Sequence, residues 1–200
     1  MNIVRKQNLL DLAFEVRKFT NEPPVIVGSQ AVFAVTDFPP EIARRSVECD
    51  FLLLKRMAEN RAKITENLGL FSEYQQQTGF YADVLGLATV VLPSGWEERL
   101  VELKNEAGEI TAFCAEIHDV CVSKLMAGRE KDFEFLQTAF EAEYLQIETF
   151  LERARTVLQS SSSAALHQRL QKLIGKIDDG NLREIVGRLR DFEDEIKSEN

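Results

Sequence analysis

Residues 44–54 read RRSVECDFLLL, and this stretch decides how the chain folds. From residue 47 onward it is apolar except at Glu48 and Asp50, which predicts a buried strand that carries two carboxylates. Because side chains alternate along a strand, both acids point to one face, with their Cα atoms about 6.5–7 Å apart. Cys49 lies between them and faces the opposite side, which argues against a thiol nucleophile.

Two carboxylates at this spacing indicate either a cation site or a solvated strand face. They can jointly hold one divalent ion, or two ions that bridge a phosphate. On a buried strand they repel each other and lose hydration, and a bound cation would offset both costs. Two acids spaced in this way more often mark a solvated face or the end of a strand, and that alternative stays open.

Upstream of the acids, residues 25–32 read VIVGSQAV, which predicts a short strand, a tight turn at Gly28-Ser29 and a short helix. Such a turn places backbone N–H groups and a hydroxyl where a phosphate binds well. The alternative is that Gly28 only makes the turn and Ser29 only caps the helix. The chain contains no GxxxxGK[ST] motif, which excludes a P-loop enzyme.

The remaining pattern predicts an α+β fold, with a small mixed sheet flanked by helices and a helical C-terminal extension. Asp83 falls on a third strand, at residues 80–84, that could adjoin Asp50. We expect one domain that contains the sheet over residues 1–142 and the extension over residues 143–200. The other expected elements are helices at 3–19, 41–45, 57–68 and 72–77, and a hairpin of 99–104 with 110–117.

The last forty residues differ in kind. The serine run at residues 160–163 is the best linker candidate in the sequence. Beyond it, apolar residues at helical spacing predict two amphipathic helices that form a hairpin or extend a bundle. These residues are Leu166, Leu170, Leu173, Ile174 and Ile177, followed by Leu182, Ile185, Leu189, Phe192 and Ile196.

Composition restricts the class of protein. An apolar fraction of 44% with 28% charged residues is typical of a globular protein. Three cysteines without a CxxC pair indicate reduced, buried thiols, not a disulfide framework or a zinc site. There is no signal peptide and no apolar run long enough to span a bilayer, so we expect a cytoplasmic protein without membrane contact. The net charge of −9 argues against broad electrostatic binding of nucleic acid but permits a local basic groove.

One lysine stands at an unusual place in the helix that follows His118. Lys124 shares the apolar face of that helix with Ile117, Val120, Cys121, Leu125 and Gly128, by i, i+3, i+4, i+7 spacing. A lysine there either extends its ammonium group past the apolar surface into solvent or meets an anion, such as a nucleoside triphosphate. Both alternatives stay open.

Together these segments resemble the polymerase-beta-like nucleotidyltransferases. That pattern is a strand, Gly-Ser or Gly-Gly, a helix, a strand with two spaced acids, and a third acid on a later strand. Here it is matched by VIVGSQAV, RRSVECDFLLL and GFYADV. LPSGWEERL and HDVCVSKLMAGREKDFEFL resemble more closely the bacterial domains of unknown function related to AbiEii-type nucleotidyltransferase toxins. The resemblance covers about residues 20–140, and KLMAGREKDFEF is its most specific part.

The resemblance implies a role for each matched residue. Gly28 and Ser29 would contact the triphosphate, and Glu48, Asp50 and Asp83 would be metal ligands and catalytic carboxylates. It implies Mg²⁺ or Mn²⁺ as cofactor and a nucleoside triphosphate as substrate. Lys124 and Arg129 would help to neutralise the phosphates.

Asp132 could equally serve as a structural ion-pair partner of Arg129, three residues earlier in the chain. Glu48 stands where the superfamily usually has Asp.

Two functions follow from these expectations. The first is metal-dependent transfer of a nucleoside monophosphate to RNA, protein or a small molecule, as an enzyme that could be the toxin partner of an antitoxin protein. The alternative is a catalytically inactive relative of the same fold that binds a nucleotide or a protein partner. The departure at Glu48 and the two amphipathic C-terminal helices motivate this alternative.

Overall fold

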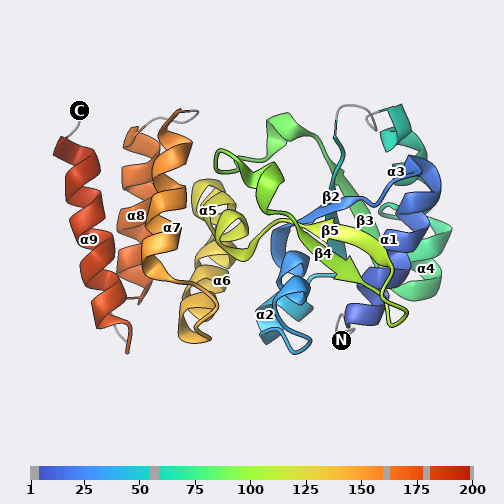
Figure 1. Cartoon of the computed structure of the whole chain (residues 1–200), viewed down its shortest axis with the longest axis horizontal. Coiled ribbons are helices and arrows are strands. Elements are labelled where there is room, and N and C mark those ends of the chain that lie inside the picture. The colour runs from blue at the N-terminus through green and yellow to red at the C-terminus, as the bar shows by residue number, and fades with distance from the viewer. Residues whose placement is uncertain (1–4, 55–58, 160–162, 178–180, 199–200) are drawn as a thin grey trace. The chain divides into compact units, whose positions relative to one another are not determined.

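The computed structural model describes residues 5–54, 59–159, 163–177 and 181–198. Within these ranges the chain forms two compact units, one from residues 1–90 and 97–116 and the other from residues 91–96 and 117–200. The first unit contains the sheet and the second is helical, as Figure 1 shows. The α+β fold with a helical C-terminal region is therefore confirmed. A domain boundary near residue 142 stays a prediction.

A five-stranded mixed sheet forms the centre of the first unit, in the order β3-β2-β1-β5-β4. β1 pairs antiparallel with β2 and parallel with β5, β2 pairs parallel with β3, and β4 and β5 form the expected antiparallel hairpin. Each predicted strand is present, although β2 is shorter than predicted at both ends. The strands are β1 (Val25–Val27), β2 (Glu48–Leu52), β3 (Tyr81–Leu85), β4 (Val101–Lys104) and β5 (Ile110–Cys114).

The two faces of β2 and β3 differ in chemistry because successive side chains alternate. One face is apolar and fully covered, and it carries Cys49, Phe51, Ala82 and Val84. Leu9 and Leu12 of the first helix line the same small space as Cys49, so this is the face that the helix covers. The opposite face carries Glu48, Asp50, Tyr81 and Asp83.

Helices α1 (Lys6–Thr20), α3 (Arg61–Leu68) and α4 (Glu73–Thr78) lie together on one side of the sheet in Figure 1. The short helix α2 (Glu41–Arg44) precedes β2. The apolar side of α1 is buried because its residues recur at helical spacing. The starts of the predicted helices at 3–4 and 57–58 lie outside the described residues. Short 3₁₀ segments complete the path: η1 (Gly28–Ala34), η3 (Leu87–Thr89) and η4 (Trp96–Arg99).

The second unit is a packed set of helices: α5 (Ile117–Ala127), α6 (Glu130–Glu141), α7 (Ile147–Thr156), η5 (Val157–Gln159), α8 (Ser163–Ile177) and α9 (Arg183–Ser198). The predicted apolar stripe of α8 is buried throughout. On α9 the buried residues are Val186, Leu189, Phe192 and Ile196. Phe140 and Phe150 meet edge to face, with ring centroids 5.4 Å apart. Of the serine run, residues 160–162 lie outside the described residues, and Ser163 begins α8.

Two further expectations can be compared with the structure. All three cysteines are buried free thiols, as expected. Among the described residues, no helix has the length and apolar character that crossing a membrane requires.

Two phenylalanines provide a matched test of the core of the first unit. Phe51 is completely buried, whereas Phe38 is 88% exposed. We expect Phe51→Ala to lower the free energy of unfolding by about 3–5 kcal/mol, because it leaves a cavity between the sheet and its helices. Phe38→Ala should change it by less than about 0.5 kcal/mol. Urea unfolding followed by circular dichroism measures both values, and equal losses in the two variants would contradict this packing.

Candidate functional site

The candidate site is the acidic face of β2 and β3. The parallel register places Asp50 beside Asp83 and Glu48 beside Tyr81. Neighbouring strands lie about 4.8 Å apart, so the two aspartates leave the sheet as adjacent side chains on one face. Asp50 and Glu48 are partly exposed and Asp83 is exposed. The structure thus brings together the acids that the spacing in the sequence had selected.

Asp50 lies directly against Gly28. The antiparallel register pairs Asp50 with Val27, the last residue of β1, and the chain then turns at Gly28 with φ of +73°. A Cβ atom added to Gly28 would lie 2.0 Å from Oδ2 of Asp50, so the carboxylate occupies the space that any other side chain would need. Glycine is required here for two reasons, the left-handed backbone and the close approach of Asp50.

Gln30 fixes the segment that follows the turn. Its side chain is 1% exposed, and its Nε2 donates to the carbonyl oxygens of Ala43 at 3.3 Å and Ser46 at 2.8 Å. These bonds connect η1 to the segment that enters β2, and so hold the glycine turn and the acidic strand in one arrangement. Periodicity did not select Gln30, because one polar residue in a short helix looks like a surface residue.

Ser29 is the second residue of η1, and the N-cap position belongs to Val27. The alternative in which Ser29 caps the helix is therefore wrong. Its hydroxyl belongs to the same turn as Gly28 and follows the residue that contacts Asp50.

Glu48 is engaged by a residue that the sequence did not single out. The hydroxyl of Tyr81 donates to Oε2 of Glu48 at 3.0 Å. Burial, the hydrogen bond to Glu48 and the nearby charges of Glu48, Asp83 and Asp50 together raise the pKa of Tyr81 to about 12. The phenol is therefore neutral at physiological pH and acts as a donor. Glu48, Asp83 and Asp50 all surround this phenol with negative charge.

The acidic face offers carboxylate oxygens to a divalent cation. Among the described residues, no group of three or more His, Cys, Asp and Glu side chains is arranged to hold a metal ion. Asp50 and Asp83 nevertheless supply adjacent carboxylate oxygens, which are the ligands that Mg²⁺ prefers. Like charges directly opposite each other destabilise a sheet, so a cation between them would relieve repulsion. The chemistry of the two aspartates suits such an ion, while the Glu48 carboxylate accepts from the Tyr81 hydroxyl.

The thiol between the two acids takes no part in this face. Burial raises the pKa of Cys49 well above its usual value, and the negative charge of Asp50 adds to the effect. Cys49 is therefore a neutral core residue, as its position on the opposite face of β2 had indicated.

Lys124 and Arg129 belong to the helical unit, where both contact Asp132. The Asp132 side chain is fully buried and accepts from Nε and Nη2 of Arg129 at 2.7 and 3.1 Å, and Nζ of Lys124 lies 3.5 Å from its Oδ1. Burial works to raise the pKa of Asp132, but the bonds from Arg129 and the charge of Lys124 outweigh it and hold the pKa below its usual value. The expected ion pair between Asp132 and Arg129 is thus present.

Lys124 is a buried cation and does not extend into solvent. It is 7% exposed, and its Nζ lies 4.6 Å from the ring centroid of Phe135. The turn between α5 and α6 is equally constrained, because Gly128 has φ of +63° and a Cβ there would lie 2.5 Å from the Arg169 guanidinium. A larger residue at position 128 would therefore have to displace the Arg169 side chain.

The contact between Gly28 and Asp50 predicts a coupled response to substitution. Gly28→Ala should destabilise the protein by about 2–4 kcal/mol, because the new methyl group meets the carboxylate and the backbone stays left-handed. In an Asp50→Ala background the same change should cost at least about 1 kcal/mol less, since the clashing oxygen is gone. Chemical denaturation of the four proteins measures the coupling, and an additive cycle would show that the two residues do not touch.

The environment of Tyr81 makes a second prediction. Glu48→Gln should lower the pKa of Tyr81 from about 12 toward its ordinary value, because a negative charge and a charged acceptor are lost. Tyr74, whose pKa is also raised to about 12 but mainly by burial and by Asp11, should not change. NMR titration with ring-labelled tyrosine resolves the two groups. A Tyr81 pKa that is the same in both proteins would contradict the hydrogen bond.

A known protein family matches most of this chain. Residues 7–168 match a family described as nucleotidyltransferase of unknown function (DUF6036). No curated protein and no solved structure matches the chain. The family match extends past both ends of the expected resemblance and reaches into α8. A narrower link to AbiEii-type toxins stays a prediction. Since the match spans most of the sequence, the chain belongs to this nucleotidyltransferase family.

Proposed function

We propose that this member of the nucleotidyltransferase family transfers a nucleoside monophosphate from a nucleoside triphosphate to an acceptor hydroxyl group. The observation that carries the proposal is the register pair of Asp50 and Asp83, held beside the Gly28 turn. Adjacent carboxylates next to a backbone turn without a side chain are suited to bind a cation together with a phosphate.

The residues of the acidic face and the adjacent turn have separate proposed roles in the reaction. Bound Mg²⁺ or Mn²⁺ would supply positive charge that neutralises the triphosphate and polarises its α-phosphate, with Asp50, Asp83 and Glu48 as ligands. The backbone N–H groups of the Gly28-Ser29 turn would donate to the triphosphate, and Ser29 would offer its hydroxyl as a further donor.

Nucleotidyl transfer needs no reactant besides the triphosphate and the acceptor hydroxyl. The acceptor oxygen forms a bond to the α-phosphorus. The bond from the α-phosphorus to the oxygen that bridges the α- and β-phosphates breaks, and pyrophosphate leaves with that electron pair. Asp83, the most exposed of the three acids, takes the proton of the acceptor hydroxyl.

Tyr81 gives a physical reason for the glutamate at position 48. The longer side chain of Glu48 reaches the Tyr81 hydroxyl at 3.0 Å. Glu48 therefore contributes to the negative field of the face while its carboxylate is oriented by a neutral donor. This arrangement supports a role as an auxiliary ligand, with Asp50 and Asp83 as the principal pair.

A role of Lys124 and Arg129 in neutralising the phosphates stays a prediction. Within the helical unit both cations pair with Asp132. The acceptor class, whether RNA, protein or a small molecule, and a role as the toxin partner of an antitoxin remain part of the proposal.

Labelled nucleotides test the transfer. We expect the protein to move label from one of the four α-labelled nucleoside triphosphates, with Mg²⁺ or Mn²⁺, to a component of a cell extract. Asp50→Asn and Asp83→Asn should each lower the rate at least about a hundredfold, because each removes charge at the cation site. Glu66→Gln, an equivalent change on the exposed surface of α3, should leave the rate unaltered.

Calorimetry with the same nucleotides and Mg²⁺ separates this proposal from the inactive alternative. Binding that depends on Asp50, without any transfer in the labelling assay, would identify a nucleotide-binding module. Labelling that is equal in the wild type and in Asp50→Asn would exclude the proposed active site.

A further inference from the structure

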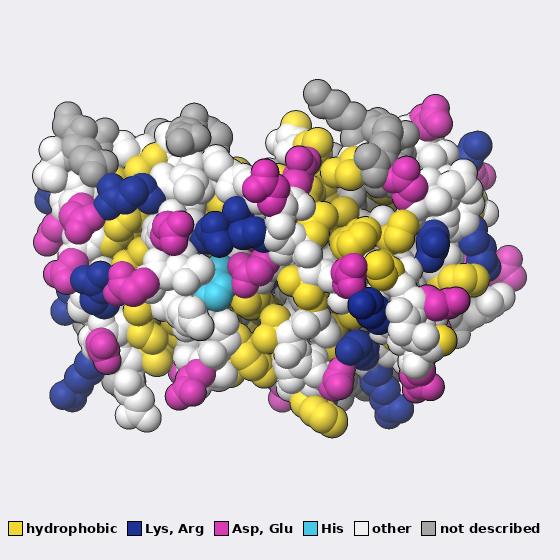
Figure 2. Space-filling view, viewed as in Figure 1, with side chains coloured by type: hydrophobic (Ala, Val, Ile, Leu, Met, Phe, Trp, Pro, Cys, Tyr) yellow, Lys and Arg dark blue, Asp and Glu magenta, His cyan; other side chains and the backbone are white. Residues whose placement is uncertain are grey.

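A second candidate site lies in the same unit, on a groove of about 600 Å³ formed by three separate segments. These are the start of α1, the segment from η1 through α2, and the end of β4 with the hairpin turn that follows it. Figure 2 shows basic side chains gathered over the start of α1, beside hydrophobic and acidic ones. The volume is within the range of about 300–1,000 Å³ that is usual for small-ligand sites.

The groove is locally basic in a chain whose net charge is −9. Four cationic side chains line it: Arg5, Lys6, Arg44 and Lys104. Asp37 and Glu106 are its acidic residues. Nζ of Lys6 pairs with Asp37 at 2.6 Å and Nζ of Lys104 pairs with Glu102 at 2.7 Å, so the two arginines give the groove its positive character.

Arg44 is held with its guanidinium partly enclosed. The side chain lies at the end of α2 and is intermediate in exposure. Among the residues that the structure describes, its Nε–H is buried without a hydrogen-bond partner. A buried donor without a partner is costly, and a phosphate oxygen in the groove would satisfy it with a charge-assisted bond.

Aromatic side chains accompany these cations. Phe33 is 1% exposed and belongs to the floor of the groove, whereas Phe38 is 88% exposed. Exposure of this apolar ring to water is unfavourable, and a stacked base would remove the ring from solvent. Cations combined with an exposed aromatic ring are the pattern that proteins use to bind single-stranded nucleic acid. An acidic peptide would use the cations but gain nothing specific from a flat ring.

We propose that this groove binds a single-stranded nucleic acid, with Arg5, Arg44 and Lys104 on phosphates and Phe38 stacked on a base. The role of this strand as the source of the acceptor hydroxyl rests on the proposed nucleotidyl transfer. Binding itself does not depend on that reaction. The groove therefore extends the proposed function by naming an acceptor class.

Fluorescence anisotropy of the full chain with a labelled oligouridylate RNA of about ten nucleotides tests the groove. We expect micromolar binding that weakens about twentyfold between about 50 and about 200 mM salt, as three phosphate contacts on a single strand imply. Arg44→Gln should weaken binding about tenfold and Phe38→Ala at least about fivefold. Asp37→Asn should strengthen binding, because it removes a carboxylate and releases Lys6.

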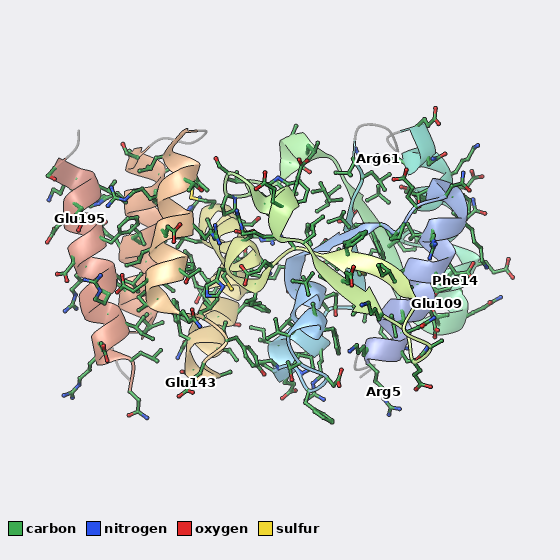
Figure 3. All side chains as sticks on the ribbon, in the orientation of Figure 1. Arg5, Phe14, Arg61, Glu109, Glu143 and Glu195 are labelled. Carbon is green, nitrogen blue, oxygen red and sulfur yellow. The ribbon has the colours of Figure 1, made fainter. Side chains whose placement is uncertain are left out.

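Arg61→Gln is the matched control. Arg61 is an exposed arginine of α3 in the same unit, and Figure 3 shows it at the far end of that unit from Arg5. Its substitution should not alter the affinity. Equal effects of Arg44→Gln and Arg61→Gln would overturn the proposed site, as would the absence of binding in the wild type.

Competitors distinguish the ligand classes. Unlabelled oligouridylate should displace the probe, and inorganic polyphosphate should displace it more weakly and without dependence on Phe38. A polyglutamate peptide that competes as well as the RNA would overturn the proposal in favour of an acidic protein partner. Asp50→Asn should bind the RNA with unaltered affinity, so a protein that binds RNA but transfers no nucleotide would refute the proposed activity alone.

Discussion

The close approach of the Asp50 carboxylate to the Cα of Gly28 is the contact on which the acidic face depends. It brings the end of β1, the middle of β2 and the start of η1 to one point, because the register pairs Val27 with Asp50. A residue larger than glycine would displace the carboxylate from its place beside Asp83. The buried amide of Gln30 then holds η1 against the entry to β2, so that the turn and the acid keep their relation. One contact therefore constrains both the backbone conformation at Gly28 and the position of the Asp50 carboxylate.

Much of this arrangement could be predicted from short-range patterns. The alternation along residues 47–54 correctly assigned Cys49 to the core and the two acids to the other face, since a strand has a fixed period of two. The β-branched run before Gly28 predicted β1 and the turn. Asp83 was selected because a third strand could adjoin β2, and the observed register aligns it with Asp50.

The parts that escaped prediction depend on contacts between distant segments. Tyr81 interacts with Glu48 only because β2 and β3 are parallel in one specific register, and no local pattern encodes that pairing. Helical spacing placed Lys124 on the apolar face of its helix, but its buried position over Phe135 and beside Asp132 arises from the packing of α5 with α6. The basic groove collects cations from three segments and is hidden in the total charge of the chain.

The central position of β1 has a consequence for the order in which the sheet forms. β1 has only three residues, and it pairs on one side with β2, a near neighbour in sequence, and on the other with β5, which is encoded far downstream. Closing the longer loop costs more chain entropy, so we expect β1 and β2 to associate before β5 joins them. The glycine–aspartate contact would then form early in folding. Selection on the acidic face would thus act on folding kinetics as well as on chemistry.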